Sequence, residues 1–85
     1  MIIDYSPEFV RRFRKLPREL KLKALEKEKI FRKNCHDPRL KTHKLSGKLS
    51  GRFAFSIDFR NRIIFSFKNS THVLFLSVGG HDIYQ

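Results

Sequence analysis

The stretch RFAFSIDFRNRIIFSFKNSTHVLFLSV (residues 52–78) decides the fold of this chain. In its first part, apolar residues occupy every second position, as Phe53, Phe55, Ile57 and Phe59. This period of two predicts a strand with one buried face, which makes Phe59 a core residue rather than a stacking surface. Two tight turns are expected in the remainder, at Arg60-Asn61 and Asn69-Ser70. Strands over residues 62–68 and 72–78 then complete an antiparallel meander.

The residues before this stretch carry a helical pattern. Met1–Tyr5 is a short apolar opening that suits a strand, and Ser6-Pro7-Glu8 is typical of a helix start, with serine as the cap. Apolar residues then recur at helical spacing, as Phe9, Phe13 and Leu16. A second helix is expected from Arg18 to about Asn34, followed by a loop to Ser50.

The order strand, helix, helix, strand, strand, strand predicts an α+β fold in a single domain over residues 1–85. The two helices would pack on one face of a mainly antiparallel four-stranded sheet, and the other face would stay free. On the second helix, Leu22 and Leu25 fall outside the buried sector. They either widen the buried face or remain exposed for a partner.

The charge balance is strongly positive. Nineteen Lys and Arg against eight Asp and Glu give a net charge of +11, and no acid stands between Asp37 and Asp58. Such a field favours RNA, DNA or an acidic protein as partner. The single Cys35 excludes an internal disulfide and favours a reducing compartment. With no signal-peptide pattern and no apolar run of membrane-spanning length, a cytoplasmic protein without membrane association is expected.

The residue types leave few kinds of chemistry open. Cys35-His36-Asp37 lacks the second ligand pair of a zinc site, and the glycines form no phosphate-binding loop. The paired carboxylates of a glycosidase are missing too, so we expect neither a metal nor a small-molecule cofactor. The remaining types suit metal-free RNA cleavage, in which the 2′-hydroxyl attacks the adjacent phosphate. Imidazoles would transfer the protons, and a guanidinium would stabilise the charge on the phosphate oxygens.

The run VGGHDIYQ (residues 78–85) holds two of the candidate catalytic residues, His81 and Tyr84. We expect its two glycines to turn the backbone sharply off the last strand. His81 and Tyr84 would then face Arg62 and His43 across the free face of the sheet.

Each candidate also has an ordinary structural interpretation. From position alone, His43 is as well explained by a surface role, Arg62 by an edge charge and Tyr84 by a frayed apolar end. Asp82 either orients an imidazole or faces water. Solvated surface positions are favoured for the other two histidines, His36 and His72.

Three runs resemble the RelE/ParE superfamily of toxins from bacterial type II toxin–antitoxin systems, most closely its RelE/StbE and YafQ-type branch. They are HKLSGKLSGRFAFSID (43–58), RNRIIFSF (60–67) and LFLSVGGHDIYQ (74–85). DYSPEFVRRFRKLP (4–17) is also similar to the first helix of these toxins. The resemblance implies a compact strand–helix–helix–three-strand fold and endoribonuclease activity on messenger RNA, commonly in the ribosomal A site, which inhibits translation. It also implies an acidic cognate antitoxin that wraps the toxin.

The same resemblance implies roles for individual residues. His43 and His81 match histidines expected to act as acid and base, without deciding which is which. Arg62 matches an arginine that contacts the scissile phosphate, and Tyr84 matches an aromatic residue near the terminus. The positions expected to hold RNA are Lys41, Lys44, Lys48, Arg52 and Arg60.

This chain departs from patterns within the family. RelE itself relies on lysines and arginines rather than on a histidine pair. YafQ-type toxins carry another histidine and a downstream aspartate around the second strand, where this chain has Ser56 and residues 58–60. ParE relatives share the fold and inhibit DNA gyrase without cleaving RNA. A ParE-like gyrase inhibitor and an inactive RNA- or antitoxin-binding module therefore stay open. Codon preference, ribosome dependence, antitoxin identity and oligomeric state stay open as well.

Overall fold

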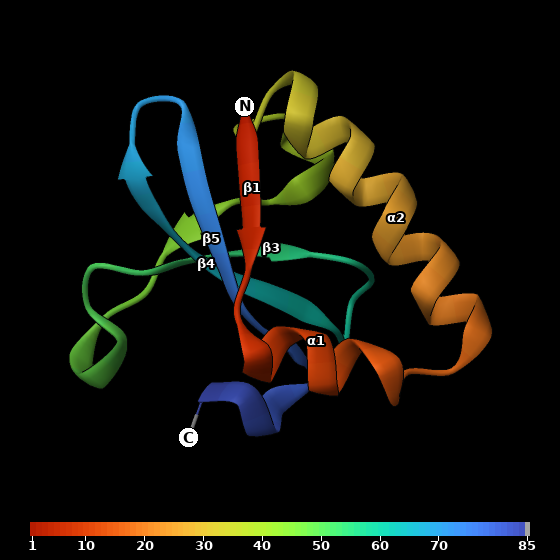
Figure 1. The fold of residues 1–85 in the computed structure, drawn as a ribbon. Coiled ribbons are helices and arrows are strands. Elements are labelled where there is room, and N and C mark those ends of the chain that lie inside the picture. The colour runs from red at the N-terminus through yellow and green to blue at the C-terminus, as the bar shows by residue number, and fades with distance from the viewer. Residues whose placement is uncertain (85) are drawn as a thin grey trace.

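The computed structural model describes residues 1–84. Within that range the chain forms two α-helices, three short 3-10 helices and a five-stranded sheet (Figure 1). The α-helices are α1 (Pro7–Arg14) and α2 (Arg18–Lys33). The strands are β1 (Ile2–Tyr5), β2 (His43–Lys44), β3 (Phe53–Ser56), β4 (Arg62–Asn69) and β5 (His72–Gly79). The 3-10 helices are η1 (Pro38–Leu40), η2 (Gly47–Leu49) and η3 (His81–Tyr84).

The sheet has the strand order β1-β5-β4-β3-β2. β1 runs parallel to β5, and every other neighbouring pair is antiparallel. The predicted α+β order is confirmed, but the predicted number of four strands is too low. The additional strand is β2, which pairs His43 with Ala54 and Lys44 with Phe53 inside the segment expected to be a loop. A strand of two residues is too short to show a period of two, so only its pairing with β3 reveals it.

The first helix begins where the cap signal places it. Ser6 Oγ accepts a hydrogen bond from the Phe9 backbone N–H at 3.0 Å. The same hydroxyl donates to the Leu76 carbonyl at 2.8 Å, so the cap also ties α1 to β5. A serine cap of this kind contributes about 1 kcal/mol of stability.

The main core lies between the sheet and the two helices, as expected. Phe31 of α2 has an exposed fraction of zero, and its ring lies 4.9 Å from the rings of both Phe55 and Phe65. Phe75 packs against it from β5 at 5.4 Å. Phe9 of α1 joins this same cluster, so both helices cover one face of the sheet.

The opposite face is not left free along its whole length. Ala54 and Ile64 are buried there beneath Ile83 of η3, and Leu49 of η2 packs against them. The segment after β5 therefore folds back over the sheet, and Figure 1 shows it lying beside α1. The expectation of an open face is wrong in this region because Ile83 and Tyr84 of η3 pack against the strands.

Two further expectations concern exposed apolar residues. β3 ends at Ser56, and Phe59 is 82% exposed, so its placement in the core is wrong. The alternation continues in the sequence after the strand has stopped. Leu22 and Leu25 are exposed on α2, which leaves them open to a partner. Neither helix within residues 1–84 is long and apolar enough to cross a membrane.

Candidate active site

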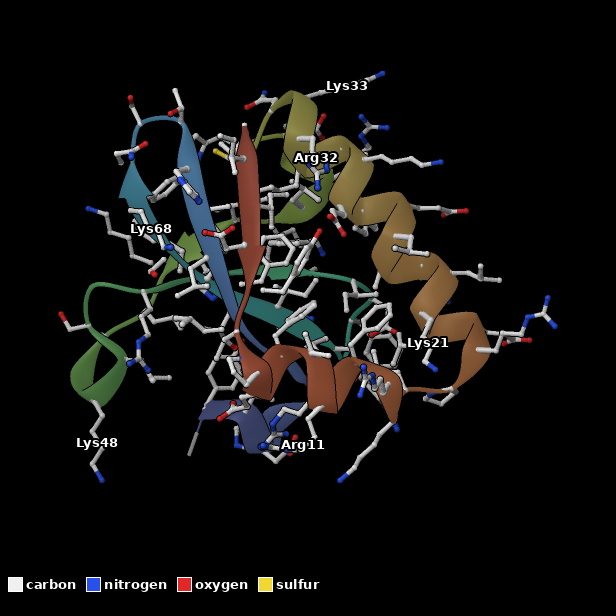
Figure 2. All side chains as sticks on the ribbon, in the orientation of Figure 1. Arg11, Lys21, Arg32, Lys33, Lys48 and Lys68 are labelled. Atoms are coloured by element: carbon white, nitrogen blue, oxygen red, sulfur yellow. The ribbon has the colours of Figure 1, made fainter. Side chains whose placement is uncertain are left out.

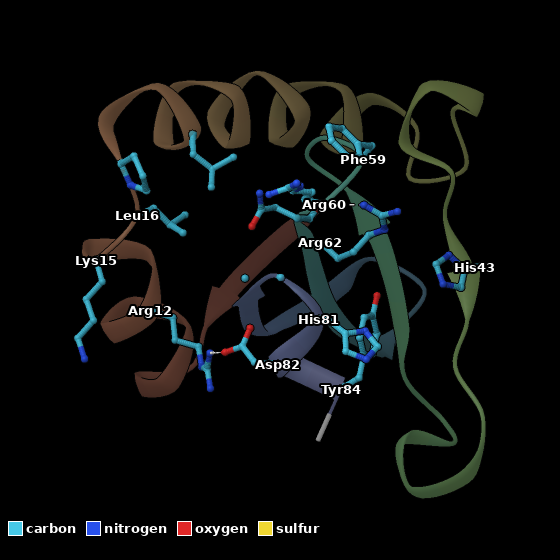
Figure 3. Close-up of a pocket in the computed structure, with 15 residues that line it drawn as sticks. Arg12, Lys15, Leu16, His43, Phe59, Arg60, Arg62, His81, Asp82 and Tyr84 are labelled. Atoms are coloured by element: carbon cyan, nitrogen blue, oxygen red, sulfur yellow. Dashed lines mark hydrogen bonds and ion pairs between the residues drawn. The ribbon is translucent and has the colours of Figure 1, made fainter.

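A cleft of about 940 Å³ opens where α1, the β3–β4 turn and η3 meet (Figure 3). Its lining includes five of the residues singled out from the sequence: His43, Arg60, Arg62, His81 and Tyr84. These come from β2, from the β3–β4 turn and the start of β4, and from η3. His43 and Tyr84, 41 positions apart in the sequence, thus line one cleft because β2, β3, β4 and β5 are consecutive in the sheet.

The other predicted RNA-binding residues lie elsewhere. Among the described residues, Lys41, Lys44, Lys48 and Arg52 are not part of this lining. Lys48 projects from the η2 segment, well separated from both helices (Figure 2). All four of these side chains are exposed, so they form basic surface outside the cleft.

Arg62 is held by the turn that precedes it. Its Nη1 donates to the backbone carbonyl of Asp58 and to that of Asn61, the latter at 3.2 Å. These hydrogen bonds hold the half-buried Arg62 side chain in place at the first position of β4. A guanidinium that keeps unused donors toward a cleft is well suited to phosphate oxygens.

The turn itself is organised by Asp58. Its Oδ1 accepts the backbone N–H of Arg60 at 2.9 Å and that of Asn61 at 2.7 Å. Burial opposes ionisation of this carboxyl, but these hydrogen bonds outweigh it and lower the pKa. Asp58 is therefore ionised at neutral pH, and its hydrogen bonds hold the backbone of the turn that carries Arg60 and precedes Arg62.

His43 is oriented by the backbone just before it. Its Nδ1 lies 3.0 Å from the Lys41 carbonyl oxygen. A carbonyl only accepts, so Nδ1 carries the proton, and in the neutral ring Nε2 has the free lone pair. Lys41 adopts a left-handed backbone with φ of 53°, which bends the chain into this arrangement.

His81 and Tyr84 are placed by the fold-back after β5. Gly79 has φ of 152°, and η3 begins two residues later. The His81 and Tyr84 rings lie 6.1 Å apart at the rim of the cleft (Figure 3). Burial raises the pKa of the Tyr84 phenol, and the nearby Arg62 charge offsets part of this effect. The phenol is therefore a protonated O–H donor at neutral pH, within electrostatic reach of Arg62.

Asp82, whose role the sequence leaves open, pairs with the first helix. Its Oδ2 accepts a hydrogen bond from Arg12 Nη1 at 2.9 Å, and this bond lowers the pKa of Asp82. The ion pair links η3 to α1, and both of its side chains belong to the cleft lining (Figure 3). Asp82 thus anchors the segment that carries His81 and Tyr84.

The two remaining histidines lie outside the cleft lining. His36 is exposed, in agreement with its expected position. His72 is half-buried, and its Nε2 lies 2.6 Å from Asp4 Oδ2, so this imidazole is bound rather than merely solvated. Within residues 1–84, no three His, Cys, Asp or Glu side chains gather closely enough to hold a metal ion.

Sequence reasoning missed three cleft residues of clear chemical character. They are Arg12, Lys15 and Phe59. Arg12 and Lys15 lie off the buried stripe of the first helix, and exposed cations at such positions do not by themselves indicate a binding site. The lining thus contains four cations, Arg12, Lys15, Arg60 and Arg62, and one carboxylate, Asp82, so the cleft is electropositive. Its chemistry suits an anionic ligand beside groups that transfer protons.

No family model and no curated protein matches this chain by sequence. Solved structures do match over nearly its whole length, and they give it the fold of the RelE/ParE toxins. One is a YoeB/ParE toxin from Agrobacterium tumefaciens, with a TM-score of 0.79, 12% identity, and coverage of 95% of this chain and 99% of that one. Another is YafQ from E. coli, with a TM-score of 0.72, 19% identity, and coverage of 96% and 94%. A third is the YoeB–YefM complex from Staphylococcus aureus, with a TM-score of 0.76, 20% identity, and coverage of 95% and 97%.

Proposed function

We propose that this chain is the toxin of a type II toxin–antitoxin system and cleaves messenger RNA on the ribosome. The observation that supports the proposal is the cleft lined by two imidazoles, a guanidinium and a phenol. Three chemical tasks have to be met there: removal of a proton from the 2′-hydroxyl, stabilisation of charge at phosphorus, and protonation of the leaving 5′-oxygen. Each task has a suitable group in the lining.

In this mechanism His43 is the base. Its Nδ1–H is engaged by the Lys41 carbonyl, so the neutral ring offers Nε2 to the 2′-hydroxyl proton. The 2′-oxygen forms a bond to phosphorus, and the bond from phosphorus to the 5′-oxygen breaks. His81 donates the proton that the 5′-oxygen takes up. The products are a 2′,3′-cyclic phosphate and a 5′-hydroxyl, and transfer of one proton from His81 and one to His43 balances the step.

Arg62 and Tyr84 assist the same step. Arg62, anchored by the turn carbonyls, faces the phosphate oxygens on which charge builds up, where each well-placed donor is worth roughly 100- to 1000-fold in rate. Tyr84 donates its O–H to a phosphate oxygen or stacks on a neighbouring base. Arg60 and the basic surface of Lys41, Lys44, Lys48 and Arg52 hold the RNA backbone through contacts that weaken with salt.

An acidic antitoxin is the protein partner in this proposal. The net charge of +11 favours an anionic partner. The Staphylococcus aureus YoeB and the E. coli YafQ of similar fold are found in complexes with YefM and DinJ. By analogy, the antitoxin of this chain would cover the cleft and neutralise its cations.

The test maps mRNA ends on translating ribosomes that are exposed to the wild-type chain, to His81→Ala or to His36→Ala. We expect cuts phased with codons for the wild type and for His36→Ala, whose imidazole is exposed outside the cleft, and their loss with His81→Ala. Undiminished cuts with His81→Ala would remove that residue from the mechanism. Absence of cuts together with inhibition of DNA gyrase would favour a ParE-like function, and absence of both effects would favour an inactive binding module.

A further inference from the structure

Phe59 is the most exposed large apolar side chain of the described residues, at 82%. The next in order, Ile2, is 58% exposed and lies on β1, far from the cleft lining. Burial of a phenylalanine side chain is worth about 1.5–3 kcal/mol, so folding gains almost nothing from this ring. Phe59 instead stands at the rim of the cleft, on the turn that carries the cationic groups (Figure 3).

The backbone that carries the ring is fixed by hydrogen bonds. The Asp58 carboxylate accepts the backbone N–H groups of Arg60 and Asn61, so the residues on either side of Phe59 are fixed. The Ile57 N–H donates to the Asn61 carbonyl at 2.9 Å and closes the turn. An aromatic side chain on a fixed backbone has only two side-chain torsions left to order, so it loses little entropy when a ligand stacks on it.

The surroundings of the ring are cationic. The Arg60 guanidinium lies 5.5 Å from the Phe59 ring centre. Arg62 lies three residues along the same turn, and its guanidinium is anchored by the Asp58 and Asn61 carbonyls. An exposed aromatic ring beside cations that suit phosphate is the arrangement used to bind single-stranded nucleic acid, because each base has a face to stack and a phosphate to neutralise.

We propose that Phe59 is the stacking platform for one nucleobase of the RNA, next to the phosphate that Arg62 contacts. This inference deepens the proposed function, on which it rests, and it makes Phe59 a determinant of where the strand is cut. A base that stacks on the ring must be unpaired and splayed from its neighbours, so the substrate is single-stranded at this position. The combination of an exposed ring with an adjacent guanidinium assigns RNA as the occupant, because a nucleotide offers both a base to stack and a phosphate to pair with the charge.

The chain contains no tryptophan, so Phe59→Trp introduces a single fluorescent reporter at the platform. The matched control is Leu22→Trp, which places the same reporter at an exposed position of α2 outside the cleft lining. Both are titrated with a single-stranded RNA hexamer that carries 2′-O-methyl groups, which cannot be cleaved because the attacking oxygen is blocked. An abasic ribose is then moved through each of its positions in turn.

We expect saturable quenching of Phe59→Trp, relief of that quenching by an abasic ribose at one position, and no saturable quenching of Leu22→Trp. Phe59→Ala should weaken hexamer binding, measured by anisotropy of a labelled hexamer, by roughly 5- to 150-fold. Equal quenching of both tryptophan variants, indifference to the abasic ribose, or no quenching at all would overturn the proposal. Because the probe is not cut, this assay does not depend on cleavage activity. A protein that stacks the probe but does not cleave ribosomal mRNA would refute the proposed function and support the stacking role of Phe59.

Discussion

Replacement of Gly79 by alanine tests whether the fold-back of η3 depends on this backbone position. Gly79 has φ of 152°, and a Cβ there would lie 2.9 Å from Cγ2 of Ile83. The chain can keep η3 docked and accept backbone strain of about 1–3 kcal/mol in addition to the contact. Alternatively it can release η3 and lose the burial of Ile83, which is worth about 1.5–3 kcal/mol. Either route lowers the free energy of unfolding by about 2 kcal/mol.

Gly80→Ala is the matched control. A Cβ at Gly80 would lie 3.7 Å from the Arg60 carbonyl oxygen, an ordinary contact distance. Urea unfolding followed by circular dichroism measures both variants. With a urea dependence of about 1 kcal/mol per M, Gly79→Ala should lower the midpoint by about 2 M, while Gly80→Ala stays within about 0.5 M of the wild type. Equal midpoints for the two variants, or a wild-type midpoint for Gly79→Ala, would refute the reasoning.

Three further predictions address the core, the ion pair and the basic surface. Phe31→Ala should lower the free energy of unfolding by about 3–5 kcal/mol, because it empties the centre of the aromatic cluster, and urea titration would measure the loss. The hydrogen bond from Arg12 lowers the pKa of Asp82, so its contribution to stability is present above the ordinary carboxyl pKa and disappears as pH falls through the lower folded value. The stability difference between wild type and Asp82→Asn should therefore shrink below about pH 4, and a constant difference down to pH 2 would contradict this account. Lys48→Ala should reduce the slope of log affinity for single-stranded RNA against log salt by about 0.7, and an unchanged slope would mean that this lysine touches no phosphate.

Local patterns were sufficient to predict most of the fold. The helix start at Ser6-Pro7 and the strand predicted over residues 62–68 depend on patterns between near neighbours in the chain, and both elements occur where expected. The short strand β2 could not be predicted in this way, because His43 and Lys44 become a strand only through pairing with β3. Phe59 was misplaced since period-two alternation does not reveal that the Asp58 turn ends the strand.

The candidate site could be predicted from the sequence only in part. The resemblance singled out Arg62 and His81, and the structure brings both into the same cleft lining. The partner of Asp82 is Arg12, seventy residues earlier in the chain, and no local pattern connects two positions so far apart. Long-range ion pairs of this kind arise from the packing of whole elements, which is why they appear only in three dimensions.

The parallel pairing of β1 with β5 ties the completion of the fold to the order of synthesis. Ile2 pairs with His72 and Tyr5 pairs with Phe75, so the strand made first waits for a partner made some seventy residues later. During translation β1 is an unpaired edge, and η3 has not yet emerged to dock on α1. A nascent chain therefore lacks both the complete sheet and the imidazole of His81, and the cleft is finished only after β5 and η3 have been synthesised.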